Sequence, residues 1–528
     1  MTDKSIFING HFHTCDPKTE GAQAIVVENG CITQIGDNIS IKPLAKSGYA
    51  VVDLKKKCVV PGLIDAHLHL LSLGRSFKRV NLDGIASLDK VKKTLNKAVV
   101  DLPANRWLIG RGWNKNLWGD DFPHKGILDE ITKNPVALRS KDGHLLWVNS
   151  TALKIFGIDA NSTDPPGGVI MKDSDGIPTG ILQEEAAEIA DIKIPKPSRK
   201  ENFQSVKDAQ MHLLKLGITG VGDCDGEANL FSIYNELDKK DQLLLRVFSM
   251  IPRDGLQGAV DSKLKTGMGS EHFRIGCLKL FADGALGSQT AFMFKPYKGS
   301  KSNYGVENLG CREIERLVKY ATGNGISVAI HAIGDRANFQ ALFSIGKYLS
   351  TYKKRGLRPR VEHAQLLRKS DINLFKAYNI IASVQPIHAT SDRDVADKYW
   401  GARSRYAYPF KTFLKLGAKL AFGSDAPIET ANPIAGIHAA VTRKRSSEKR
   451  AGWYPEERLT PSQAIEAYTR GSSYACCYDD ICGSISIGKR ADLVILSDDI
   501  FEIRPDKIAQ AEVLMTVIDG KIAYSQSD

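Results

Sequence analysis

Short apolar runs alternate with longer segments of helical spacing through the middle of the chain. Eight of these runs are hydrophobic almost throughout, which is typical of parallel strands buried on both faces. The intervening segments, such as 311–324 and 371–378, have the spacing of amphipathic helices. Eight strands joined by helical crossovers predict a (β/α)8 barrel of the α/β class. The predicted strands are Leu63–His67, Ile218–Gly222, Leu244–Met250, Arg274–Phe281, Ser327–Ile333, Arg360–Gln365, Ile380–Gln385 and Lys419–Ser424.

Both ends of the chain have a different pattern, with short β-rich runs separated by turn residues. Asp519-Gly520 near the C-terminus is a hairpin turn signal. We therefore expect one small β-sandwich domain formed from both chain ends, residues 1–60 and 471–528. The barrel is expected over 61–470. Because about 150 residues separate its first two strands, we expect an insertion at about 80–205, near the barrel mouth.

Composition narrows the function classes. The chain has 528 residues, with 72 Lys and Arg against 60 Asp and Glu, a net charge of +12. No long basic tract with interleaved aromatics occurs, so nucleic-acid binding is not expected. The sequence contains no run of 18 apolar residues, so no membrane-spanning helix is predicted. The nine cysteines are scattered without CxxC spacing, and the first residues lack the apolar core of a secretory signal. We expect a cytoplasmic protein.

The first predicted barrel strand ends in Asp65-Ala66-His67-Leu68-His69. Alternation along an extended chain places His67 and His69 on the same side, where two imidazoles suit one metal ion. The spacing alone is weak evidence, because His11-Phe12-His13 repeats it in the β-rich N-terminal segment. We expect this second copy to lie in the β-sandwich domain and to bind no catalytic metal.

The ends of other predicted barrel strands also carry polar residues that suit a metal site. A single histidine at the end of a buried strand is more often a packed, hydrogen-bonded residue than a ligand. Several such residues at ends on one barrel face are harder to explain by packing, and catalytic residues collect at the carboxyl face of barrels. The sequence therefore predicts a metal site there. Its further members are Lys279 on strand four, His331 on strand five, His363 on strand six and Asp425 after strand eight.

These positions resemble those of the amidohydrolase superfamily of metal-dependent hydrolases. Its members place HxH after strand one, Lys after strand four, His after strands five and six, and Asp after strand eight. Residues 61–69, PGLIDAHLH, are similar to the superfamily's opening signature. The chain also resembles amidohydrolase family 3, which includes YtcJ-like proteins and N-substituted formamide deformylases. The motifs that carry this resemblance are Asp142-Gly143-His144, residues 149–153, 180–184, 279–288 and 424–427.

The resemblance implies a ligand set. His67, His69 and Asp425 would hold one metal, and His331 and His363 a second. Lys279 would bridge them if carboxylated, because a free ammonium has no lone pair; a plain charged lysine in the mouth is the alternative. One or two divalent ions are expected, with zinc as the first choice, while iron, manganese or nickel suit similar ligands. Asp425 would also take a proton from the attacking water and pass it to the leaving nitrogen.

Three candidates for substrate binding lie in the insertion. His144 could hydrogen-bond a substrate carbonyl or the oxyanion, or be a structural cap. Trp113 could form an apolar pocket wall or pack in a core. Glu184 could contact the metal pair or a polar substrate group, or supply charge at a helix N-terminus.

Taken together, these features predict a metal-dependent amidohydrolase that cleaves a non-peptide carbon–nitrogen bond in a small amide, with N-substituted formamides as one substrate class. The alternative is a catalytically inactive barrel used as a binding or regulatory scaffold. Such a barrel would lack one or more ligands, whereas all six positions are filled here. Specificity is expected in the loops after strands seven and eight, including Gln385-Pro386-Ile387-His388. The stretch 392–405 is open to two roles, a lid or a homodimer contact.

Overall fold

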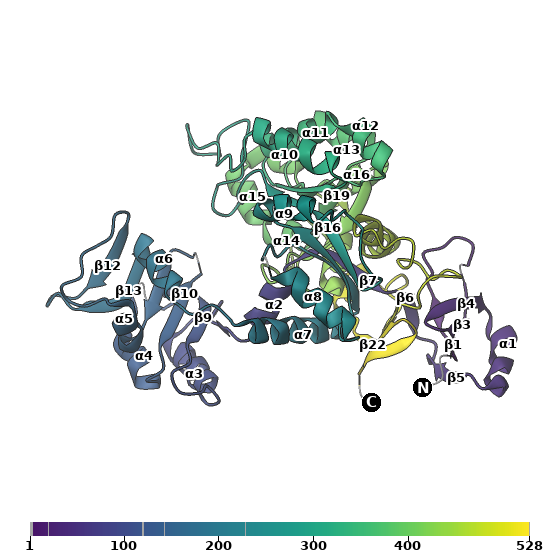
Figure 1. The fold of residues 1–528 in the computed structure, drawn as a ribbon, viewed down its shortest axis with the longest axis horizontal. Coiled ribbons are helices and arrows are strands. Elements are labelled where there is room, and N and C mark those ends of the chain that lie inside the picture. The colour runs from purple at the N-terminus through teal and green to yellow at the C-terminus, as the bar shows by residue number, and fades with distance from the viewer. Residues whose placement is uncertain (1–3, 20, 119–120, 142, 228, 527–528) are drawn as a thin grey trace. The chain divides into compact units, whose positions relative to one another are not determined.

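The computed structural model describes residues 4–19, 21–118, 121–141, 143–227 and 229–526 (Figure 1). The chain divides into two compact units. One consists of residues 1–72 and 206–528, and the other of residues 73–205. None of the helices in the described ranges combines the length and the apolar character needed to cross a bilayer.

The first unit contains an eight-stranded parallel sheet that closes into a barrel. The sheet order, β7-β14-β15-β16-β17-β18-β19-β20, follows the chain. At the carboxyl end the two outer strands meet: the Asp425 amide donates to the His67 carbonyl at 2.7 Å, and the His69 amide to that of Ala426 at 2.8 Å. The predicted barrel is thus confirmed. The strands are β7 (Leu63–Leu68), β14 (Ile218–Asp223), β15 (Arg246–Ile251), β16 (Phe273–Phe281), β17 (Val328–Ala332), β18 (Arg360–His363), β19 (Ile381–Val384) and β20 (Lys419–Phe422).

Amphipathic helices pack outside the barrel strands, as their spacing predicts. In α10 the buried positions Ile314, Leu317, Val318 and Ala321 recur every three or four residues and form one apolar stripe. Figure 1 shows α10 to α13 and α16, in green, grouped around the barrel strands. The principal helices are α8 (Leu230–Lys239), α9 (Leu256–Asp261), α10 (Cys311–Gly323), α11 (Asp335–Gly346), α12 (Leu349–Arg355), α13 (Lys369–Ala377), α16 (Phe410–Lys415) and α17 (Pro433–Thr442).

Two further sheets of this unit are built from the ends of the chain. One has the order β4-β3-β1-β5 and the other β2-β6-β21-β22-β23, so that strands from both termini pair in the second. One apolar core is shared by Phe7, Ile25, Val59, Leu493 and Val517. The β-sandwich formed from both ends is thus confirmed, while the exact domain limits at 60 and 470 stay a prediction. The strands are β1 (Lys4–Ile8), β2 (His11–Phe12), β3 (Ala24–Glu28), β4 (Cys31–Gly36), β5 (Ala50–Asp53), β6 (Cys58–Pro61), β21 (Leu493–Leu496), β22 (Val513–Ile518) and β23 (Lys521–Ser525).

The second unit has a core of its own around a six-stranded mixed sheet of order β12-β13-β11-β10-β9-β8. Apolar side chains from helices α3 and α4 pack on this sheet, including Val91, Leu95 and Leu128. The elements are β8 (Val80–Asn81), β9 (Leu108–Trp113), β10 (Val136–Ser140), β11 (Leu145–Val148), β12 (Gly168–Lys172), β13 (Pro178–Glu184), α3 (Leu88–Val99), α4 (Lys125–Ile131), α5 (Ser150–Phe156) and α6 (Glu185–Ile192).

Candidate metal centre

The carboxyl end of the barrel brings together the four histidines that the sequence singles out there. The ring centroids of His67 and His69 lie 5.9 Å apart, and those of His67 and His363 lie 4.8 Å apart. The His331 ring lies 4.5 Å from that of His363. These rings come from β7, β17 and β18 and from the residue next to the end of β7, so barrel closure is what assembles the cluster.

Asp425 lies at the centre of this cluster. Its Oδ1 is 3.5 Å from Nε2 of His67 and 3.3 Å from Nε2 of His69. These separations are too long for a strong direct hydrogen bond. Two ligands bound at about 2 Å to one tetrahedral ion lie about 3.3 Å apart, so the spacing fits a cation between them. On its other side, Asp425 Oδ2 is 3.7 Å from Nε2 of His388.

Each of the four clustered histidines has one ring nitrogen facing a fixed hydrogen-bond acceptor. The facing nitrogen carries the hydrogen, which leaves a lone pair on the other nitrogen. Metal-binding histidines in proteins are commonly oriented in this way. The pairs are His67 Nδ1 with Glu362 Oε2 at 2.6 Å, His69 Nδ1 with Asp225 Oδ1 at 3.4 Å, His363 Nδ1 with Gln385 Oε1 at 2.8 Å, and His331 Nε2 with the Gly284 carbonyl at 3.0 Å.

The electrostatics of the cluster also favour a cation. Burial, with the nearby charge of Lys279, lowers the pKa of His67 to about 4 and that of His331 to about 3, so both rings are neutral at pH 7. Burial alone would raise the pKa of Asp425, but the surrounding histidines hold it well below its usual range, so Asp425 is ionised. For His69, burial opposes protonation, but the carboxylates of Asp225 and Asp425 outweigh it and raise its pKa to about 9.

Lys279 projects from β16 into the same buried end of the barrel. Its side chain is 4% exposed, and its Nζ lies 5.0 Å from the ring centroid of Phe281. Within the described part of the chain, Nζ has no hydrogen-bond partner. A buried ammonium without a partner is costly. The neutral imidazoles of His67 and His331, the ionised carboxylate and this unpaired amine therefore fit a centre for divalent cations better than a closed packing of side chains.

The sequence analysis missed a buried ion pair behind His67. Arg360 Nε donates to Glu362 Oε1 at 2.5 Å, and its Nη2 donates to the Ala66 carbonyl at 2.6 Å and to Ser383 Oγ at 2.8 Å. Glu362 thereby holds His67 while Arg360 connects β7, β18 and β19. Its signal was present in the sequence, because two charged residues in a strand that is buried at every position are unusual.

The substrate-binding candidates of the insertion lie in the second unit. His144 Nδ1 and Glu184 Oε2 are 3.0 Å apart, and both side chains are exposed. Glu184 has φ +48°, a conformation that non-glycine residues rarely adopt and that occurs at functional sites. Trp113 is 1% exposed, and its Nε1 donates to the Leu138 carbonyl at 2.7 Å, which favours the core-packing alternative. Roles in substrate binding stay predictions for all three. Asp142, next to His144 in its motif, lies outside the described residues.

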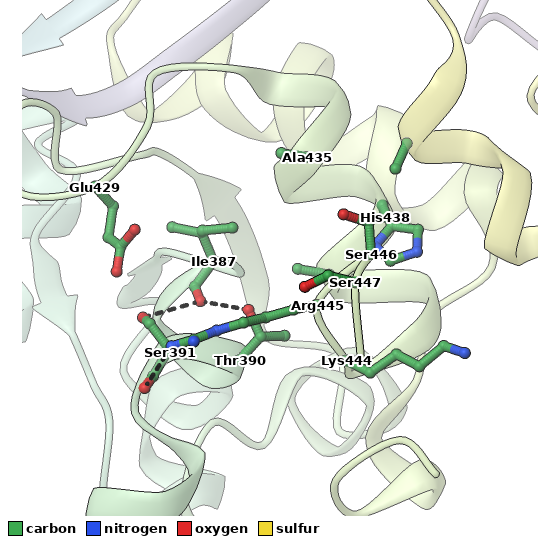
Figure 2. A pocket seen from close by; sticks show the side chains of 12 residues that line it. Ile387, Thr390, Ser391, Glu429, Ala435, His438, Lys444, Arg445, Ser446 and Ser447 are labelled. Atoms are coloured by element: carbon green, nitrogen blue, oxygen red, sulfur yellow. Dashed lines mark hydrogen bonds between the residues drawn. The ribbon is translucent and has the colours of Figure 1, made fainter. Parts of the chain in front are cut away.

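A cavity of about 290 Å³ lies beside α14 (His388–Ser391), in the loop after strand seven. Thr390 and Ser391 line it on one side and His438 of α17 on another. Figure 2 shows the Arg445 side chain extending toward Ser391, to whose carbonyl it donates at 3.1 Å. None of the clustered histidines lines this cavity, so it is distinct from the metal centre although α14 is common to both.

Comparison with known proteins agrees with this geometry. The model of the Amidohydrolase family (Amidohydro_3) matches residues 50–524. Protein LONG AFTER FAR-RED 3 of Arabidopsis thaliana is 35% identical over 98% of this chain and 91% of that protein. Putative amidohydrolase YtcJ of Bacillus subtilis is 32% identical, covering 99% and 100% of the two chains. N-substituted formamide deformylase of Arthrobacter pascens is 26% identical, covering 99% and 98%.

A solved structure shares the fold. The crystal structure of an uncharacterized metal-dependent hydrolase from Pyrococcus horikoshii superposes with a TM-score of 0.79 at 29% identity, covering 95% of this chain and 99% of that one. The family match extends from the last strand of the N-terminal sheet, through the whole barrel, to the C-terminal hairpin. The chain therefore belongs to the amidohydrolase family of metal-dependent hydrolases.

Proposed function

We propose that this protein hydrolyses a non-peptide carbon–nitrogen bond in a small amide, with N-substituted formamides as the first substrate class to test. The observation that carries the proposal is the set of four histidines, each fixed by an acceptor and grouped around one ionised carboxylate. The 26% identical relative named N-substituted formamide deformylase supports the substrate class. The cytoplasm as location and a homodimer as assembly stay predictions.

The residues divide between two cation positions. His67, His69 and Asp425 would hold one ion, and His331 and His363 the other. Lys279 would bridge them as a carbamate, since carboxylation converts its unpaired buried amine into two acceptor oxygens. Zinc is the proposed metal for this histidine-rich set. A bound divalent cation supplies a lowered pKa for water, from about 16 to about 7, and polarises the scissile carbonyl.

The chain's own residues then handle the protons. Asp425, ionised among the histidines, accepts a proton from the attacking water and delivers it to the leaving nitrogen. Glu362, Asp225, Gln385 and the Gly284 carbonyl hold the rings in place, so little reorganisation is needed during the reaction. Burial of the cluster keeps bulk water from competing for these contacts.

Elemental analysis of the purified protein, followed by a screen of N-substituted formamides and other small amides, tests the proposal. We expect one or two equivalents of a divalent metal per chain and turnover of at least one non-peptide amide. A protein with full metal that hydrolyses no amide would favour the alternative of a binding or regulatory scaffold. A protein that binds no divalent metal would contradict the proposal altogether.

A further inference from the structure

One more histidine reaches the centre, and its surroundings differ from those of the other four. We propose that His388 is a substrate-binding catalytic residue, whose Nε2–H donates a hydrogen bond to the carbonyl oxygen of the substrate. The inference rests on the proposed amide hydrolysis for its substrate. His388 lies in the loop after strand seven and is not one of the six proposed metal-ligand positions.

The neighbour of His388 determines where its hydrogen lies. His388 Nδ1 is 3.4 Å from Nε2 of Gln365, which is a donor. With the Gln365 amide in this orientation, Nδ1 presents its lone pair and the hydrogen resides on Nε2. In the four clustered histidines the anchored nitrogen instead faces an acceptor. His388 consequently offers a hydrogen toward the centre, whereas His67, His331 and His363 offer lone pairs.

The Nε2–H group of His388 is buried and lacks an acceptor. The residue is 8% exposed, and over the residues that the structure describes its Nε2 has no hydrogen-bond partner. The nearest carboxylate oxygen, Asp425 Oδ2, is 3.7 Å away, beyond hydrogen-bond range. Leaving a buried donor unpaired costs about 1–3 kcal/mol, so the site is built for an acceptor that a ligand brings.

The position of the ring suits a substrate oxygen. The rings of His388 and His363 are stacked nearly parallel, 5° apart in plane with centroids 6.0 Å apart, so His388 lies directly beside the cluster. Asp425, the proposed proton carrier, lies between His388 and the His67–His69 pair. As the carbonyl becomes tetrahedral, its oxygen gains negative charge, and a fixed buried donor binds that charge more strongly than the ground state.

Two backbone hydrogen bonds hold this arrangement. Gln385 accepts from His363 through its side chain, while its carbonyl accepts from the His388 amide at 3.1 Å. Gln365 is fixed in turn, because its carbonyl accepts from the Tyr408 amide at 2.7 Å. The two glutamines thus give the adjacent histidines opposite tautomers, His363 with its hydrogen on Nδ1 and His388 with its hydrogen on Nε2.

A direct test needs no substrate. In ¹⁵N-histidine NMR spectra of the metal-loaded protein, the His388 signal is identified by its loss in His388→Gln. We expect the neutral tautomer with hydrogen on Nε2, and hydrogen on Nδ1 for His67 and His363. A His388 with its hydrogen on Nδ1 would overturn the proposal. Because this readout is independent of turnover, it distinguishes a failure here from a failure of the proposed amide hydrolysis.

Two amide variants test the catalytic role. The side-chain nitrogen of Gln reaches the place of Nε2, whereas that of Asn reaches only the place of Nδ1. We expect His388→Asn to keep its metal and lose about 10²–10³-fold in kcat, and His388→Gln to recover most of that loss. Loss of a metal equivalent in both variants would show that His388 is a metal ligand. Equal turnover in both variants would show that the proposed hydrogen bond does not contribute to catalysis. Either result overturns the proposal.

His438→Gln is the matched control for these variants. His438 is also buried, and its Nε2 also has no hydrogen-bond partner among the described residues, but it lines the neighbouring cavity (Figure 2). We expect it to retain both metal and turnover. If His438→Gln reduced kcat as much as His388→Asn, loss of any buried imidazole near α14 would explain the effect, and the specific role of His388 would fail.

Discussion

Two His-x-His pairs in this chain each meet one aspartate from a distant part of the sequence, and they differ in burial and in the groups that orient their rings. In the β-sandwich, Asp499 Oδ2 is 2.6 Å from His11 Nδ1 and 3.1 Å from His13 Nε2, which are direct hydrogen-bond distances. In the barrel, Asp425 Oδ1 is 3.5 Å and 3.3 Å from the two Nε2 atoms. Both groups have ligand atoms within 4.8 Å of one another, so proximity alone does not separate them.

The burial of the histidine rings and the groups that orient them do distinguish the barrel group from the sandwich group. The His11 side chain is 49% exposed, whereas that of His67 is 1% exposed. In the sandwich the rings contact the aspartate itself, so direct hydrogen bonds account for the arrangement. In the barrel, Glu362 and Asp225 contact the far sides of the rings, and the near sides lie 3.5 Å and 3.3 Å from Asp425 Oδ1, the spacing of ligands around one ion. The comparison teaches that a motif identifies a metal centre only together with the groups that orient it.

The largest expected effect concerns Asp425. Asp425→Asn keeps the shape of the side chain and a carbonyl oxygen for the metal but cannot carry a proton. We expect the fold and much of the metal to remain while turnover falls roughly 10²–10⁴-fold. Metal content and turnover are measured on the same preparation. A variant with full metal and nearly wild-type turnover would remove Asp425 from the mechanism.

The second-largest effect is expected for Glu362, the carboxylate that contacts the His67 ring. Glu362→Gln weakens the hold on the His67 ring and leaves Arg360 with a neutral partner. We expect metal affinity to fall about 10–100-fold, as measured by competition with a chelator. The matched variant in the sandwich, Asp499→Asn, is expected to leave that affinity unchanged. Equal affinities for Glu362→Gln and the wild type would show that the support of the ring contributes nothing.

The third effect concerns Lys279, because the proposed second cation position depends on its carboxylation. We expect the intact protein at neutral pH to exceed its sequence mass by one CO₂, which acid removes. Lys279→Gln should lose this addition and about half of its bound metal, as determined by native mass spectrometry and elemental analysis. An unmodified lysine in a protein that still binds two ions would refute the bridge.

Much of this site was accessible from sequence, for a physical reason. Barrel strands buried on both faces read as continuous apolar runs, so the polar residues at their ends stand out. The sequence does not show which ring each supporting acceptor holds. Glu362 lies 295 positions from His67 along the chain, and Asp225 and Gln385 are in segments where polar residues are ordinary. Only closure of the barrel brings them to the rings.

The insertion was harder to interpret. Its mixed sheet buries Trp113 beside Trp118 and Trp147, and a tryptophan in such a core has the same sequence appearance as one in a pocket wall. The pairing of His144 with Glu184 depends on strands β11 and β13, whose residues Leu145 and Gln183 are opposite each other. Long-range register of this kind is not encoded in local spacing.

The smallest expected effect is in the sandwich. Asp499→Asn removes a partly exposed pair with His11 and His13, so the free energy of unfolding should fall by about 1 kcal/mol or less. Chemical denaturation of both proteins with metal present measures the difference. Loss of several kcal/mol together with a metal equivalent would mean that the sandwich group holds a structural ion.

The central claim is that the barrel group, and not its sandwich counterpart, is the catalytic metal centre. Two double variants test it directly, His67→Gln with His69→Gln, and His11→Gln with His13→Gln, each analysed for metal per chain after identical purification. We predict that the barrel variant loses at least one equivalent and that the sandwich variant keeps the wild-type content. Full metal in the barrel variant, or a loss confined to the sandwich variant, would contradict the account.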